Sequence, residues 1–127
     1  EGHEFGVKFS ERAGRFSGTA SYFDLTREGE VRRDFTRETL TGRVPLFIPG
    51  GTQAARGAEF ELHYSPRPNL QFVVNYTRLW DANITQDTTQ PFIVGARLRN
   101  APPYAGAVWT RYTVDTGAWR GLYFTAG

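Results

Sequence analysis

The chain has 127 residues, enough for one ordinary domain, and 15% of them are aromatic. It contains no cysteine, which excludes a disulfide framework, a thiolate nucleophile and a thiolate metal site. Its 15 basic and 13 acidic residues nearly balance, so the net charge gives no reason to expect a nucleic-acid partner. The purely apolar runs span only a few residues, and a membrane-spanning helix needs about 20. A membrane-spanning strand remains possible, because only every second residue of such a strand faces lipid.

The first half of the chain predicts two strands and a long loop. Alternation of polar and apolar residues predicts strands over residues 4–10 and 16–25, and the short link between them contains Gly14. Residues 26–56 are mainly polar and are interrupted by prolines and glycines, which predicts a long loop.

The clearest strands follow over residues 57–65 and 70–80, and Val73 is the main exception to their alternation. In a membrane barrel, one face of this pair is expected to meet lipid and the other the polar lumen. The predicted lipid-facing residues are Ala58, Phe60, Leu62, Tyr64, Leu70, Phe72, Val74 and Tyr76. The predicted lumen-facing residues are Glu59, Glu61, His63, Gln71, Asn75 and Thr77.

Two weaker strands are predicted over residues 104–114 and 122–127, after a long connection at 81–103 and a short one at 115–121. The five connections are therefore short, long, short, long and short. In an up-and-down meander, alternate connections emerge on the same side. Outer-membrane barrels have this asymmetry, with tight periplasmic turns and long extracellular loops. We therefore predict an all-β fold, an antiparallel up-and-down meander of about six strands that is a fragment of a large transmembrane barrel.

Several segments in order resemble the segments of one known protein family. The first is Arg-Gly-Ala-Glu-Phe-Glu-Leu at residues 56–62, followed by a Pro-containing turn and a strand with Asn-Tyr-Thr at 75–77. Asp-Ala-Asn-Ile-Thr at 81–85 and Gly-Ala-Arg-Leu-Arg-Asn-Ala-Pro at 95–102 are similar to family segments at corresponding places. A strand with Val-Trp-Thr-Arg-Tyr at 108–112 follows, and Gly-Val-Lys at 6–8 and Tyr-Phe-Asp-Leu-Thr-Arg at 22–27 are also similar to family segments. Together these segments resemble the family of TonB-dependent outer-membrane receptors of the siderophore type, and the resemblance covers nearly the whole chain except the long loop.

The resemblance implies an integral barrel of about 22 strands in the bacterial outer membrane, of which residues 1–127 supply about six. It also implies uptake of a ferric siderophore or a related nutrient chelate, with energy from TonB. The plug domain and the TonB box of such receptors are absent from this sequence. The expected partners are outer-membrane lipid and lipopolysaccharide, the ferric siderophore, and TonB through the absent N-terminal part.

Candidate ligand contacts lie in the long predicted loop, where Arg32, Arg33, Arg37 and Arg43 cluster. Guanidinium groups bind oxyanions in a fixed geometry, so these arginines suit an anionic siderophore or lipopolysaccharide phosphates. A solvated surface is the simpler interpretation of the same residues.

Catalysis has little support in the sequence. Glu59, Glu61 and His63 alternate along one strand face, where they could act as metal ligands or an acid/base pair, but a polar barrel lining explains them more simply. No motif of a nucleophilic enzyme or phosphate-binding loop is present. We therefore expect no enzyme, no metal site and no bound cofactor. The alternatives are another outer-membrane barrel, such as a porin or adhesin, or a soluble β-sandwich or lipocalin-like binding module.

Overall fold

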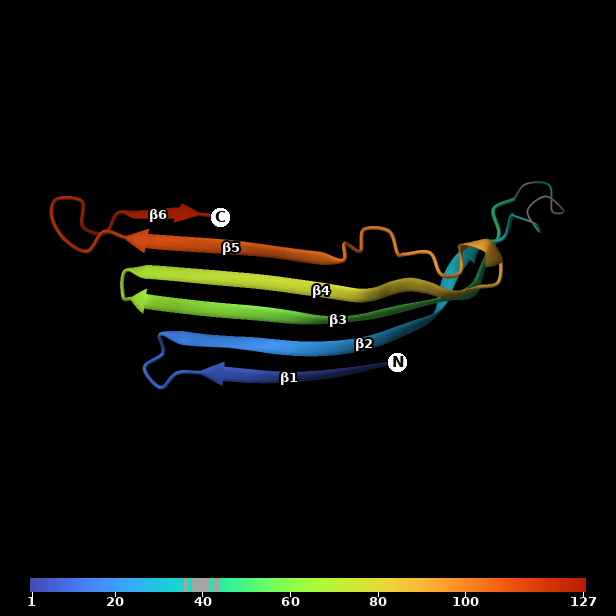
Figure 1. Ribbon diagram of the computed structural model, residues 1–127. Helices are drawn as coiled ribbons and strands as arrows, with labels where there is room; N and C mark the ends of the chain where they lie inside the picture. The colour runs from blue at the N-terminus through green and yellow to red at the C-terminus, as the bar shows by residue number, and fades with distance from the viewer. Residues whose placement is uncertain (36, 38–41, 43) are drawn as a thin grey trace. The chain divides into compact units, whose positions relative to one another are not determined.

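The computed structural model describes residues 1–35, 37, 42 and 44–127. Six strands form one sheet in the order β1 to β6, so every strand pairs with its neighbour in the sequence. Figure 1 shows this succession of hairpins. The strands are β1 (Gly2–Ser10), β2 (Phe16–Arg33), β3 (Phe47–Arg67), β4 (Leu70–Asp87), β5 (Tyr104–Thr113) and β6 (Tyr123–Ala126), and the 3-10 turn η1 (Pro91–Ile93) precedes β5.

The predicted meander of six antiparallel strands is confirmed. The described residues form a single sheet without a second layer, which contradicts the sandwich alternative. Among these residues Ala82 is the sole buried apolar side chain, and large apolar side chains such as Phe5 and Val7 are about two-thirds exposed. No helix in the described part of the chain is long and apolar enough to cross a membrane.

The strands β2, β3 and β4 are longer than predicted. Residues 26–33, 47–56 and 81–87 were expected in loops, and all of them belong to strands. Residues 26–33 and 81–87 are largely polar, and residues 47–56 contain a proline and two adjacent glycines, so these segments lack the apolar alternation by which a strand is recognised in sequence. Backbone hydrogen bonding between neighbouring strands does not need that alternation, because every residue except proline carries a donor and an acceptor.

The described chain divides into two compact units. We call one the turn-side unit (Glu4–Tyr22, Ala58–Arg78 and Tyr104–Gly127), since it contains the connections 11–15, 68–69 and 114–122. We call the other the loop-side unit (Glu1–His3, Phe23–Gly57 and Leu79–Pro103), since it contains the connections 34–46 and 88–103.

Aromatic rings form a row across the strands of the turn-side unit. Phe9 packs against Phe16 with 5.4 Å between ring centroids and against Phe60 at 6.4 Å. Tyr64 continues the row, 6.3 Å from both Phe16 and Phe72. Phe9 on β1 reaches Phe60 on β3 across Gly18 of β2, where a Cβ atom would lie 2.6 Å from the Phe9 ring. The missing side chain of Gly18 therefore makes room for this ring.

The register of β4 and β5 settles which residues of β5 share a face with those of β4. Leu70 pairs with Tyr112, Val74 with Val108 and Arg78 with Tyr104, while Gln71 pairs with Arg111 and Val73 with Trp109. Directly opposed residues of an antiparallel pair lie on the same face. Val73, the exception to the alternation of β4, therefore lies on the same face as Trp109.

Candidate functional site

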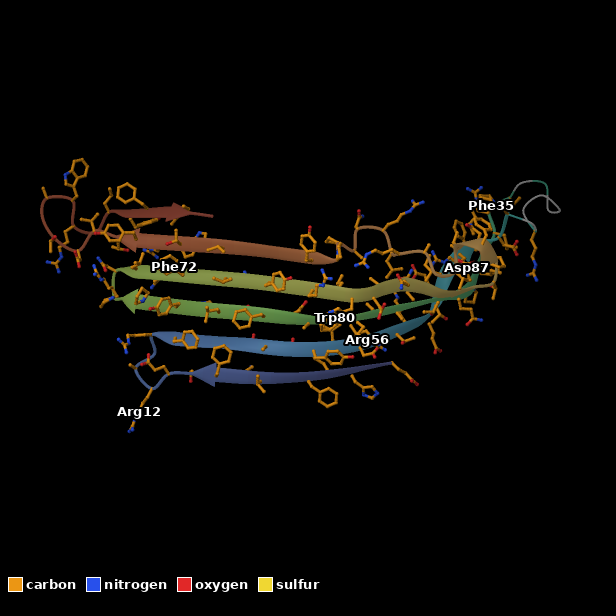
Figure 2. The ribbon with its side chains drawn as sticks, in the orientation of Figure 1. Arg12, Phe35, Arg56, Phe72, Trp80 and Asp87 are labelled. Carbon is orange, nitrogen blue, oxygen red and sulfur yellow. The ribbon has the colours of Figure 1, made fainter. Side chains whose placement is uncertain are left out.

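Asp87, at the end of β4 in the loop-side unit, is held by one ion pair and three hydrogen bonds (Figure 2). Its side chain is fully buried, and its Oδ2 lies 3.1 Å from Nε of Arg32, near the end of β2. Its Oδ1 accepts hydrogen bonds from the backbone N–H of Thr89 at 2.9 Å, from the Thr89 hydroxyl at 2.9 Å and from the backbone N–H of Gln90 at 2.7 Å. Asp87 thus holds the start of the 88–103 connection to the end of β2.

The charge state of Asp87 follows from these contacts. Burial acts to raise the pKa of this carboxyl group, because it penalises the charged form. The hydrogen bonds from Gln90 and Thr89, together with the charge of Arg32, outweigh burial and lower the pKa below its ordinary value. Asp87 is therefore a carboxylate at neutral pH.

Two glycines of β3 allow this arrangement. A Cβ atom on Gly51 would lie 2.7 Å from Nε of Arg32, and one on Gly50 would collide with the Thr88 hydroxyl. The sequence predicted that these glycines lie in a long loop. In the structure they are strand residues whose lack of a side chain lets Arg32 and Thr88 approach the backbone of β3.

The connection 88–103 folds back beside β4. Ile84 donates its N–H to the Ala96 carbonyl, Gly95 donates to Ile84, and Leu98 donates to Ala82. Gly95 has a φ of 88°, in the left-handed region that glycine adopts without strain. This pairing places Arg97 opposite Asn83.

A polar hollow of about 710 Å³ lies in the loop-side unit between these segments. Arg32, Arg97 and Arg99 contribute cationic groups, Glu30 a carboxylate, and Gln53 and Gln90 amides. Its apolar wall includes Ile84, Ile93 and Leu98. The hollow therefore combines several cations with a single acid and an apolar wall.

The cations of the hollow differ in how they are held. Arg97 donates to the Ala101 carbonyl at 2.8 Å and to the Leu79 carbonyl at 3.5 Å, so it supports the backbone of the connection. Nη2 of Arg32 and Oε2 of Glu30 are buried without a hydrogen-bond partner among the described residues. Arg99 is exposed. Buried polar groups normally have hydrogen-bond partners. Nη2 of Arg32 and Oε2 of Glu30 therefore mark a place where a ligand, water or another part of the receptor can bind.

The described residues of the predicted arginine cluster have different neighbours in the structure. Arg32 lines the hollow, whereas Arg33 stacks on Phe35 at 5.1 Å and Arg37 lies 3.5 Å from Asp34. Arg32 and Arg33 lie in β2 and not in a loop, which corrects their predicted placement. Arg43 lies outside the described residues.

Sequence reasoning missed Glu30, Gln53, Gln90, Arg97 and Arg99 as site residues. The segment with Arg97 and Arg99 entered the sequence analysis only as part of a family resemblance. Two arginines spaced by two in the second long connection were a usable signal, since alternate connections of a meander emerge on the same side.

A second charged cluster of the loop-side unit joins three strands. Arg56 on β3, labelled in Figure 2, donates from Nε to Oδ2 of Asp24 on β2 at 3.0 Å. Its Nη2 lies 2.9 Å from the same oxygen. Its Nη1 lies 3.9 Å from Oδ2 of Asp81 on β4. All three side chains are at least one-third exposed, so the cluster suits a cross-strand brace more than a reaction centre.

The polar row on β3 in the turn-side unit has one internal contact. Nε2 of His63 lies 2.8 Å from Oε1 of Glu61, and both side chains are about half exposed. Within the described part of the chain, no three metal-ligating residues come together. The assignment of the two faces of β3 and β4 to lumen and lipid stays a prediction.

A single meander sheet with exposed apolar side chains and extended polar strand ends is the architecture of a piece of barrel wall. The family model described as TonB dependent receptor-like, beta-barrel, matches residues 1–127, and the chain belongs to that family.

Among solved structures, the chain is similar to the siderophore receptor PiuA from Acinetobacter baumannii, with a TM-score of 0.70 and 22% sequence identity. The match covers 87% of this chain and 16% of the PiuA chain, and at this identity it shows the fold alone. The comparison with curated proteins gave no match.

Proposed function

We propose that this chain forms part of the barrel wall of a bacterial outer-membrane receptor that takes up a ferric siderophore or a related nutrient chelate, with energy from TonB. The family match over residues 1–127 carries the proposal. The chain corresponds to only 16% of the similar solved receptor, so the proposal concerns the full-length receptor that contains it. The plug domain and the TonB box are expected in other parts of that receptor.

The hollow of the loop-side unit supplies the proposed ligand contacts. Long connections of outer-membrane barrels lie on the extracellular side, where the chelate arrives. Arg32 and Arg99 attract an anionic chelate, and the apolar wall contacts its ligand groups. The proposal thus keeps Arg32 from the predicted cluster and adds Arg99.

Binding to the full-length receptor, purified in detergent, tests the ligand contact. We expect a ferric chelate from a panel of catecholate, hydroxamate and carboxylate types to bind, and Arg99→Gln to weaken that binding about tenfold, as loss of one charge-assisted hydrogen bond does. Arg27→Gln is the matched control, because Arg27 is an exposed arginine of β2 that does not line the hollow. Equal affinity of both variants contradicts the proposed contact.

Uptake in the bacterium that carries the gene tests the transport step. Under iron limitation, deletion of the receptor gene should abolish growth on the chelate that binds. Deletion of TonB should abolish uptake and leave surface binding intact. Unchanged iron uptake in the receptor deletion contradicts the proposed function.

A further inference from the structure

An apolar groove of about 480 Å³ crosses four strands of the turn-side unit. Ala20 and Ala58 line it, and their short side chains leave space between larger neighbours. Phe5, Phe60, Tyr76 and Arg78 also line it. All three rings are more than one-third exposed, so the groove is open along its length.

The groove lies on the predicted lipid-facing side of the sheet. Ala58, Phe60 and Tyr76 all belong to the predicted lipid-facing set, and Arg78 follows Tyr76 by two residues on the same strand face. Glu59 also lines the groove, but it lies between Ala58 and Phe60 in the sequence and belongs to the predicted lumen-facing set. It also borders a separate polar hollow with Glu61, Asn75 and Thr77 of the predicted lumen-facing set.

Arg78 is therefore a cation on an otherwise apolar face. It pairs across the sheet with Tyr104, and its guanidinium carbon lies 6.0 Å from the centroid of that ring. It forms no ion pair with any residue that the structure describes. An arginine on a lipid-facing surface is strongly destabilising at the bilayer midplane and nearly neutral near the interface. Its depth along the strand decides between these cases.

The position of Arg78 along β4 places it at an interface. Arg78 lies eight positions after Leu70, the first residue of β4, which corresponds to about 27 Å along the strand at about 3.4 Å per residue. With a strand tilt of about 40°, this is about 20 Å along the membrane normal, close to the height of an apolar band about 25 Å tall. If the turn at 68–69 lies at the periplasmic border, Arg78 lies near the extracellular border.

We propose that this groove binds a lipopolysaccharide molecule of the outer leaflet, with an acyl chain over Ala20 and Ala58 and a lipid A phosphate at Arg78. The inference rests on the proposed outer-membrane location. The groove supplies the apolar contact for an acyl chain. The guanidinium of Arg78, beside Tyr104, complements the charge of a phosphate. The chain beyond Arg78 leads to the long connection 88–103, which assigns this border to the extracellular leaflet.

Lipid retained by the full-length receptor tests the inference. The receptor is extracted from outer membranes, purified in detergent, and its bound lipid is quantified by native mass spectrometry. We expect bound lipopolysaccharide to fall about tenfold in Arg78→Gln, as loss of a charge-assisted contact does, and severalfold in Ala58→Leu, which fills the groove without adding charge. Arg78→Lys keeps the charge and should retain most of the lipid.

Two control variants separate this site from general lipid contact. Arg67→Gln removes an exposed arginine of the same unit, and Val108→Leu enlarges an exposed side chain on the same face outside the groove. Both should retain lipopolysaccharide as the unchanged receptor does. Retention by Arg78→Gln and Ala58→Leu that equals retention by the unchanged receptor overturns the inference, as does equal binding of added phosphatidylglycerol and added lipopolysaccharide.

The experiments distinguish failure of the proposed transport function from failure of the proposed lipid site. A receptor that fractionates with the outer membrane and holds lipopolysaccharide at Arg78, but takes up no chelate, supports the lipid site and contradicts the transport proposal. A receptor absent from the outer-membrane fraction overturns both.

Discussion

The two units of the chain use the same three strands in different ways. In the turn-side unit, neighbouring strands are joined by aromatic rings, as in the row from Phe9 to Phe72. In the loop-side unit, β2 is joined to β3 and β4 by ion pairs, those of Arg56 with Asp24 and of Arg32 with Asp87. The change falls within continuous strands, at Tyr22–Phe23 in β2, Gly57–Ala58 in β3 and Arg78–Leu79 in β4.

This difference shows that one backbone ladder can support two kinds of lateral packing. Backbone hydrogen bonds between strands form whatever the side chains are. The medium around each part of a strand therefore decides which side chains are stable there. Apolar rings suit lipid, and ion pairs suit an aqueous surface. The following predictions test the contrast, from the largest expected effect to the smallest.

A new charge on the apolar face of the turn-side unit should have the largest effect. We expect Phe60→Arg to destabilise the full-length receptor by about 2–4 kcal/mol, because it places a cation among lipid tails. Glu59→Arg, one residue earlier on the opposite face, should be nearly neutral. Urea titration of the receptor in lipid vesicles measures both, and equal losses would show that the two faces do not differ in environment.

Removal of the Asp87 carboxylate should locally open the loop-side unit. Asp87→Ala leaves the amides of Thr89 and Gln90 without their acceptor and Arg32 without its partner, at a cost of about 2 kcal/mol. Hydrogen exchange of the 88–90 amides should accelerate accordingly. Asp87→Asn keeps an acceptor oxygen and should have a smaller effect. Unchanged exchange in Asp87→Ala would show that the 88–103 connection is held by other contacts.

The same group gives the loop-side unit a pH dependence. The pKa of Asp87 is lowered in the folded state, so its stabilisation is complete at pH values above its ordinary pKa of about 4. It is lost as the pH falls through the lower, folded-state pKa. Protection of the 88–90 amides should therefore be constant near neutral pH and decline in acid. Asp87→Asn should remove this decline, and an identical acid profile in that variant contradicts the assignment.

The exposed brace around Arg56 should contribute least. Arg56→Gln should cost about 0.5 kcal/mol, because solvent screens exposed pairs. Asp24→Asn should have a greater effect than Asp81→Asn, since the Arg56 guanidinium lies 2.9 Å from Asp24 and 3.9 Å from Asp81. Denaturant titrations of the three variants compare these effects. A loss of several kcal/mol would show that the cluster is buried in the complete receptor.

The parts of the fold that were predictable are those with a local signal. Alternation in residues 57–65 and 70–80 placed most of the turn-side parts of β3 and β4, and the Pro-containing turn between them was recognised. The strand extensions at 26–33 and 81–87 were missed because their residues are mainly polar, and the extension at 47–56 was missed because a proline and two glycines interrupt it. Gly50 and Gly51 suggested a loop, since glycine signals turns in sequence but also permits close approach within a sheet.

The candidate site was predictable only in its chemistry. A surplus of arginine near the long connections pointed to anion binding, but Arg33 and Arg37 are engaged with Phe35 and Asp34. Arg97 and Arg99 were not chosen because nothing in the local sequence links them to Arg32. Their common hollow arises from the pairing of residues 95–98 with β4.

The sequence by itself determined the strands with alternating faces, the positions of the tight turns and the family to which the chain belongs. These depend on neighbours along the chain, where each side chain's direction follows from its place in the strand. The tertiary structure alone decided which charges meet. Arg32 meets Asp87, and Arg56 meets both Asp24 and Asp81, because strand register brings together residues that lie far apart in the sequence.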